Sequence, residues 1–235
     1  MPSSLTFALL RRIAAAFLLL LSFLTARGQE DYRFEIGGGL GMTGYLGDSN
    51  SANMYSHPGW DLELAFRYLR SPRIAFKTQA FAGSLNGSTK NMTDLLPDPG
   101  LADYSFSTTF FQVAEMFEFN FWNFGMGESY RKLKRFSPYI TAGLGLSVWT
   151  TKGYTGAAFT IPFGIGAKYK LRERLNLGIE FQMAKTFSDK LDSPTLADPH
   201  GIKSSFLKNT DWYSCLSVTL TYEFSKRCAV CNYKE

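Results

Sequence analysis

The stretch IPFGIGAKYKLRERLNLGIEFQM, residues 161–183, contains two segments in which apolar residues alternate with polar or small ones. Residues 161–169 carry apolar side chains at every odd position, and residues 175–183 do the same. The charged pair Arg172-Glu173 separates the two segments and is compatible with a tight turn. Alternation with a period of two predicts β-strands with one apolar and one polar face, so this stretch predicts an antiparallel hairpin.

The same alternation recurs along the rest of the chain. Eight strands are predicted, at residues 34–46, 60–68, 74–82, 111–121, 140–148, 161–169, 175–183 and 216–224. Most are near the ~9–11 residues that a tilted strand needs to cross a bilayer. One charged residue, Glu115, breaks the pattern because it falls on the apolar face of its strand. The predicted fold is an all-β, eight-stranded antiparallel up-and-down transmembrane β-barrel, with a two-sheet β-sandwich as the alternative.

The connections between these strands differ in length on the two sides. Four are polar and mostly long, at residues 47–58, 85–105, 150–158 and 187–210. The other three are the turn at 71–72, the stretch 122–136 and the turn at 172–173. Long extracellular loops and short periplasmic turns are typical of outer-membrane barrels, so we expect both termini in the periplasm.

The first residues have the pattern of an export signal. Arg11 and Arg12 precede an apolar run over 13–21, and the small residues Ala26 and Gly28 follow. The run is shorter than the ~20 residues of a membrane-spanning helix. We therefore predict a signal peptide over 1–28, a barrel over 29–225 and a periplasmic tail over 226–235.

Composition agrees with a barrel facing lipid. Aromatic residues make up 16% of the chain, yet the mean hydropathy is only −0.11. Aromatic side chains near strand ends, such as Trp60, Tyr68, Tyr169 and Tyr222, are expected to form girdles at the membrane interfaces. The net charge is +5, but the basic residues are scattered, so we expect contact with lipid or lipopolysaccharide phosphates and no nucleic-acid binding.

Charged residues occupy the polar faces of the predicted strands. An eight-stranded barrel has an interior that side chains fill, so inward charges are expected to pair and to plug the barrel. The expected interior charges are Glu63, Arg67, Lys77, Glu118, Lys168, Glu180 and Glu223.

Two features on the predicted periplasmic side are candidates for docking a partner. The stretch 122–136 is basic and includes Arg131, Lys132, Lys134 and Arg135. The tail carries Cys228 and Cys231, which in an oxidising periplasm are not expected to stay free. Pairing with each other, binding a metal and bridging to another protein remain open, because Cys215 makes the cysteine count odd.

Catalytic motifs are weak in this sequence. His57 and His200 lie in predicted loops, with Ser56 and Ser204 nearby, but no nucleophile elbow surrounds either serine. We expect no enzymatic activity, no cofactor and no metal site.

Five stretches resemble a known family: EIGGGLGMTGYLGD at 35–48, FEFNFW at 117–122, RFSPYITAGLGLSV at 135–148, IPFGIGAKYKLRERLNLGIEF at 161–181 and GIKSSFLKNTDWYS at 201–214. They resemble the PorG-type outer-membrane component of the Bacteroidota type IX secretion system. The resemblance implies a non-enzymatic eight-stranded barrel that ties a periplasmic ring of PorK and PorN proteins to the outer membrane. The alternatives are a stand-alone barrel for adhesion or envelope stability and a barrel enzyme that modifies lipid A.

Overall fold

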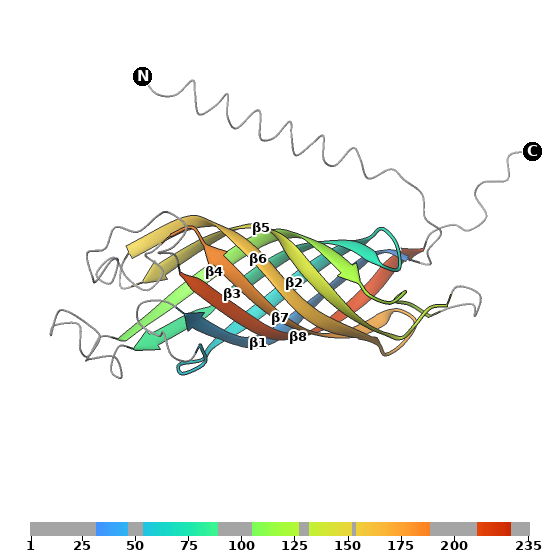
Figure 1. Ribbon diagram of the computed structural model, residues 1–235, viewed down its shortest axis with the longest axis horizontal. Coiled ribbons are helices and arrows are strands. Elements are labelled where there is room, and N and C mark those ends of the chain that lie inside the picture. Colours follow the sequence, from blue (N-terminus) through green and yellow to red (C-terminus); the bar gives the residue numbers. More distant parts are fainter. Residues whose placement is uncertain are drawn as a thin grey trace, which may run out of the picture.

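The computed structural model describes residues 32–46, 54–88, 105–126, 132–151, 154–188 and 211–226, which form one closed antiparallel barrel (Figure 1). The strands are β1 (Tyr32–Leu46), β2 (Gly59–Leu69), β3 (Ile74–Ser88), β4 (Ser105–Asn120), β5 (Phe136–Thr151), β6 (Tyr154–Lys170), β7 (Leu175–Thr186) and β8 (Trp212–Lys226). Each strand pairs with its neighbours in the chain, and β1 closes the sheet by pairing with β8. The predicted eight-stranded barrel is confirmed, and the two-sheet sandwich is wrong.

Because the sheet is closed, every strand pairs with a neighbouring strand on both sides. Leu40 of β1, for example, pairs with Leu62 of β2 on one side and with Val218 of β8 on the other. A closed sheet has no edge with free hydrogen-bonding groups, which is the condition for placing strands in lipid. Because side chains alternate along each strand, this register keeps the apolar residues on one face.

The two faces of the sheet are reversed relative to a water-soluble protein. Large apolar side chains point outward, with Leu40 and Leu144 both 69% exposed. Charged side chains point inward, with Arg67 1% exposed and Lys77 fully buried. An apolar exterior around a polar interior is stable in lipid, so we treat the middle of the outer face as the membrane-facing belt. No helix within the described ranges is long and apolar enough to cross a membrane.

The barrel has two ends, which we name by their connections. The terminal rim carries the start of β1, the end of β8 and the β2–β3, β4–β5 and β6–β7 connections. The loop rim carries the other four connections. Exposed aromatic side chains lie toward both ends, including Trp60 on the loop side and Tyr169 and Tyr222 on the terminal side. The expected 1–28 signal peptide and the tail beyond Lys226 lie outside the described residues.

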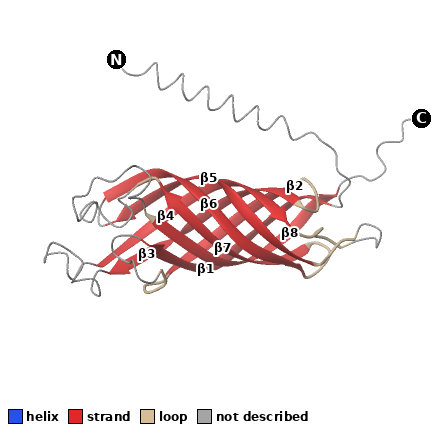
Figure 2. Cartoon of the chain, in the orientation of Figure 1, coloured by secondary structure: helices blue, strands red, loops and turns tan. Residues whose placement is uncertain are grey.

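Six strands, β3 to β8, extend at least three residues further toward the loop rim than the sequence predicted. Figure 2 shows the strands running without a break to that end of the barrel. The predicted connection 150–158 is wrong, because β5 and β6 stay paired as far as Thr151 and Tyr154. Likewise β3 runs to Ser88 and β4 starts at Ser105, inside the predicted connection 85–105. Serine and threonine occupy the outer face there, so the apolar alternation stops while the hydrogen-bonded ladder continues.

Candidate functional site

Arg67 is the centre of the first charge network inside the barrel. Its Nη1 donates to Glu35 Oε1 at 2.8 Å, and its Nε donates to Glu118 Oε2 at 2.9 Å. Lys168 forms a second ion pair with Glu118. All four side chains are at most 2% exposed, so this network links β1, β2, β4 and β6 across the interior.

A second network joins β3, β5 and β7. Lys77 Nζ lies 2.7 and 2.8 Å from the two carboxylate oxygens of Glu180. The Tyr139 hydroxyl donates to Glu180 Oε2 at 2.7 Å. A buried carboxylate held by a cation and a phenol has its charge and its lone pairs satisfied together.

The third network lies on β6, β7 and β8. Lys170 Nζ is 2.6 Å from Glu223 Oε1, and Asn176 Nδ2 donates to the same oxygen at 2.8 Å. Asn176 also donates to Glu35 at 3.2 Å, which connects this network with the Arg67 network.

Glu63 is buried but is held by neutral groups. Gln79 Nε2 donates to its Oε1 at 2.9 Å, and Ser217 Oγ donates to its Oε2 at 2.7 Å. The structure therefore places all seven predicted charges inside the barrel, and it brings six of them into ion pairs.

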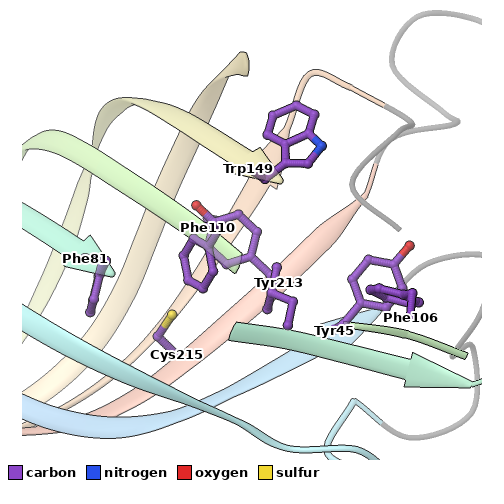
Figure 3. Packing of buried hydrophobic residues seen from close by; sticks show 9 residues of the cluster. Tyr45, Phe81, Phe106, Phe110, Trp149, Tyr213 and Cys215 are labelled. Carbon is purple, nitrogen blue, oxygen red and sulfur yellow. The ribbon is translucent and has the colours of Figure 1, made fainter. Parts of the chain in front are cut away.

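An aromatic layer fills the interior nearer the loop rim (Figure 3). Tyr213 and Phe110 have ring centroids 5.2 Å apart, and Tyr45 meets Phe106 edge-on at 5.1 Å. Trp149 packs over Gly156, where a Cβ atom would come within 2.5 Å of the indole ring. Side chains thus occupy the interior at two levels, one charged and one aromatic, as expected for a barrel of eight strands.

The described residues of the β4–β5 connection, 121–126 and 132–135, meet at the terminal rim in a parallel bridge between Phe124 and Lys134, and we call these two segments together the hairpin. Gly125 N donates to Lys134 O at 3.0 Å, and Lys134 N donates to Asn123 O at 2.7 Å. Phe124 N donates to Pro72 O at 3.1 Å, which fixes this hairpin to the β2–β3 turn. The ring of Phe124 lies 5.0 Å from Lys168 Nζ, so the hairpin also covers the charged interior.

Basic residues of the predicted docking surface lie on the exposed side of this hairpin. Lys132, Lys134 and Arg135 are all exposed, and Lys134 Nζ lies 4.5 Å from the centroid of the Trp122 ring. Arg131, Cys228 and Cys231 lie outside the described residues. Cys215 is described, and its thiol is free and buried inside the barrel, in the aromatic layer.

A second cluster on the terminal rim connects the β6–β7 turn with the first and last strands of the chain, β1 and β8. Arg174 donates to the hydroxyls of Tyr222 and Tyr32, both at 3.0 Å, and Tyr32 donates to Glu173 at 2.6 Å. The hydrogen bonds to Tyr222 and Tyr32 raise the pKa of the Arg174 guanidinium. This turn is therefore fixed on the rim rather than projecting from it.

The candidate catalytic residues are not assembled in the part of the chain that the structure describes. His57 and Ser56 are exposed on the β1–β2 connection, while His200 and Ser204 lie outside the described residues. Within those same limits, no three metal-ligating side chains gather into a group that could hold an ion.

The sequence reasoning missed several members of the interior networks. Glu35 and Lys170 lie on the predicted polar faces, so the same alternation identifies them once every inward charge is counted. Tyr139 and Asn176 have no comparable signal, because a single tyrosine or asparagine on a strand is common. The aromatic layer was missed because most of its residues lie outside the predicted strands.

Solved structures with a similar fold are small outer-membrane barrels. Neisserial surface protein A matches with 11% identity and a TM-score of 0.50, covering 81% of this chain and 97% of that one. Ail of Yersinia pestis, in complex with a heparin analogue, matches with 10% identity and a TM-score of 0.49, covering 83% and 100%. At these identities the likeness shows the fold alone.

Sequence comparison gives the family. No protein with a curated description matches the chain. A family model described as a domain of unknown function, DUF6089, matches residues 11–233. Because this match spans nearly the whole chain, the protein belongs to the DUF6089 family.

Proposed function

We propose that this protein is a non-enzymatic outer-membrane anchor of a type IX secretion machinery. In this proposal the terminal rim faces the periplasm and binds ring proteins of the PorK/PorN type. The observation that carries the proposal is the ordered basic hairpin at 121–126 and 132–135, fixed to the β2–β3 turn and presenting Lys132, Lys134 and Arg135. The five stretches that resemble the PorG-type component support it.

The filled interior supports an anchoring role over a transport role. The charge networks and the aromatic layer place side chains across the barrel at two levels. A partner held at the terminal rim needs a rigid surface, and the hairpin supplies one without opening the barrel. Cargo would then leave through another protein of the machinery.

The test is capture of ring proteins from native outer membranes. We expect the triple variant Lys132→Glu, Lys134→Glu, Arg135→Glu to lose co-purifying ring proteins while keeping the folded barrel. The matched control is Arg172→Glu, which reverses an exposed charge on the β6–β7 turn of the same rim. Full capture of ring proteins by the triple variant would show that this hairpin is not the dock.

The tail cysteines need a separate experiment. A non-reducing gel of the same outer-membrane complexes should show whether Cys228 or Cys231 joins a partner. A double Cys228→Ser, Cys231→Ser variant should then remove any disulfide-linked band. If capture and secretion are both unchanged in that variant, the tail has no part in docking.

A second candidate is a stand-alone barrel for adhesion or envelope stability. The paired strands that extend toward the loop rim favour it, because Ser107 and Thr109 of β4 and Thr150 of β5 present hydroxyls on the outer face there. This candidate predicts normal type IX secretion when the gene is deleted, with loss of surface binding or envelope integrity. Loss of secretion would favour the anchor.

A further inference from the structure

Glu115 lies on the lipid-facing side of β4, among large apolar residues. Val113 and Phe117, its outward neighbours on the strand, are 42% and 44% exposed. Its partner across the β4–β5 pairing is Leu144, one of the most exposed apolar residues of the barrel. The position thus belongs to the membrane-facing belt and not to either rim.

The depth of Glu115 rules out simple contact with water. It lies four positions from the outward Phe111 on one side and four positions from the outward Phe119 on the other. A tilted strand advances about 10 Å along the membrane normal over four residues. A glutamate side chain is too short to cover that distance, so its carboxyl group stays within the hydrocarbon region.

The described part of the barrel supplies one hydrogen bond to this carboxyl group. Thr78 on β3 donates its hydroxyl to Glu115 Oε1 at 2.7 Å on the outer face of the sheet. A single bond from a neutral hydroxyl does not balance a carboxylate in lipid. Polar residues at such positions are usually retained for a function, and their partners lie on the lipid-facing side.

The surface beside Glu115 permits close approach by another protein. Toward the loop rim from Thr78, the outward residues of β3 are Ala80 and Ala82. They lie in a line of small side chains between larger outward residues of the neighbouring strands, Leu62 and Leu64 on β2 and Phe111 and Val113 on β4. Small residues at a membrane interface let two protein surfaces pack closely. The two alanines are therefore consistent with a docking site here, whereas Glu115 and Thr78 determine where it lies.

We propose that Glu115 and Thr78 form a lateral docking site, within the membrane, for a different membrane protein that carries a lysine or arginine on its lipid-facing surface. A cation is the partner that complements a carboxyl group in hydrocarbon best, because an ion pair there satisfies both charged groups together. A second copy of this chain does not supply one, because Lys185, the outward cation among the described side chains of the strands, lies at the loop-rim end of β7. The partner is therefore distinct from the periplasmic ring proteins proposed for the terminal rim.

The test uses a photo-crosslinking amino acid at Val113 in native outer membranes, with the same probe at the outward Ile179 of β7 as the control position. We expect the Val113 probe to form an adduct with a membrane-spanning segment that bears an outward lysine or arginine. The variant Glu115→Leu should reduce this adduct about tenfold or more, since it removes one side of a desolvated charge pair. Glu115→Gln should reduce it less.

Stability measurements separate docking from a structural role. Glu115→Leu removes a polar group from the lipid face, so the isolated barrel should unfold at an equal or higher urea concentration. Three results would each overturn the proposal: adducts with lipid alone, adducts with a second copy of this chain, or a Val113 adduct that Glu115→Leu leaves unchanged. Marked destabilisation of the isolated barrel would do the same, by giving Glu115 a structural role.

Discussion

At the scale of single residues, the interior is held together by charges that could not be buried alone. Arg67 meets two carboxylates, and Glu180 meets a lysine and a phenol. Burying a charge is costly unless it is paired and hydrogen-bonded, and a barrel of eight strands leaves little room for water to do this. The inward side chains therefore have to satisfy one another.

Removing Arg67 should destabilise the barrel strongly. In Arg67→Met, Glu35 loses its ion-pair partner, whereas Glu118 keeps Lys168. The expected loss of unfolding free energy is about 3–5 kcal/mol, because a carboxylate is left buried without its cation. Urea unfolding in lipid vesicles, followed by tryptophan fluorescence, measures it.

The control for this prediction is Arg172→Met, an exposed arginine whose loss should cost less than about 0.5 kcal/mol. The double variant Glu35→Gln, Arg67→Met should lose less than the sum of its two single variants, because the residues interact directly. Strict additivity would contradict the network.

Gly166 is required by the close approach of Tyr139. A Cβ atom there would lie 2.4 Å from Tyr139 Cζ and 2.7 Å from the carbonyl oxygen of Ile179. We expect Gly166→Ala to cost about 1–3 kcal/mol, the range for forced overpacking. Gly38→Ala is the control, since its Cβ would meet no atom closer than 3.1 Å. Equal unfolding midpoints for the two variants would contradict this packing.

At the scale of elements, the terminal-rim hairpin behaves as part of the barrel. Its backbone bonds to the β2–β3 turn, and the Arg73 Nε donates to Asn123 Oδ1 at 2.7 Å. Phe124 lies within 5.3 Å of Lys170 Nζ as well as near Lys168. The hairpin is therefore held in place by contacts with the β2–β3 turn and with the lysines of β6. The positions of its basic residues are fixed by the same contacts.

Arg73→Ala should loosen this hairpin without loosening the strands. We expect faster amide hydrogen exchange at Phe124, Gly125 and Lys134, whose backbone amides donate the hairpin bonds. Exchange within β4 and β5 should stay unchanged. Arg70→Ala, on the same turn, is the control. Faster exchange in both variants would mean that the turn itself, and not the Asn123 contact, holds the hairpin.

At the scale of the whole molecule, closure of the sheet produces a filled barrel. The charge networks occupy the interior toward the terminal rim, and the aromatic layer around Trp149 and Tyr213 occupies it toward the loop rim. Because the interior is filled at two separate levels, removing the side chains of one level does not open a path for ions through the barrel. The barrel suits a fixed support in the membrane better than a channel.

Conductance across planar lipid bilayers tests this arrangement. The purified protein should give no stepwise conductance, and Trp149→Ala should give none either, because the charge networks remain. A known porin, reconstituted in the same bilayers, serves as the positive control. Stable conductance steps from the unmodified protein would contradict a filled interior.

The sequence by itself determined the fold and the direction of each strand's faces. Period-two alternation is local, so it can be counted along the chain, and it placed Glu63, Arg67 and Lys77 correctly inside. Beyond the lipid, as at Thr150 and Thr155, the outer face no longer needs apolar residues, so the alternation stops although the strands stay paired. For this reason the predicted loop 150–158 was wrong.

Tertiary structure alone decided which inward residues meet. Glu35 and Glu118 are 83 positions apart in the chain, yet both contact Arg67 because closing the barrel brings β1, β2 and β4 around one interior. The attachment of the hairpin to the β2–β3 turn could not be predicted from the sequence either. Pairing depends on strand register and closure, which join residues distant in sequence, whereas alternation depends only on the geometry of a single strand.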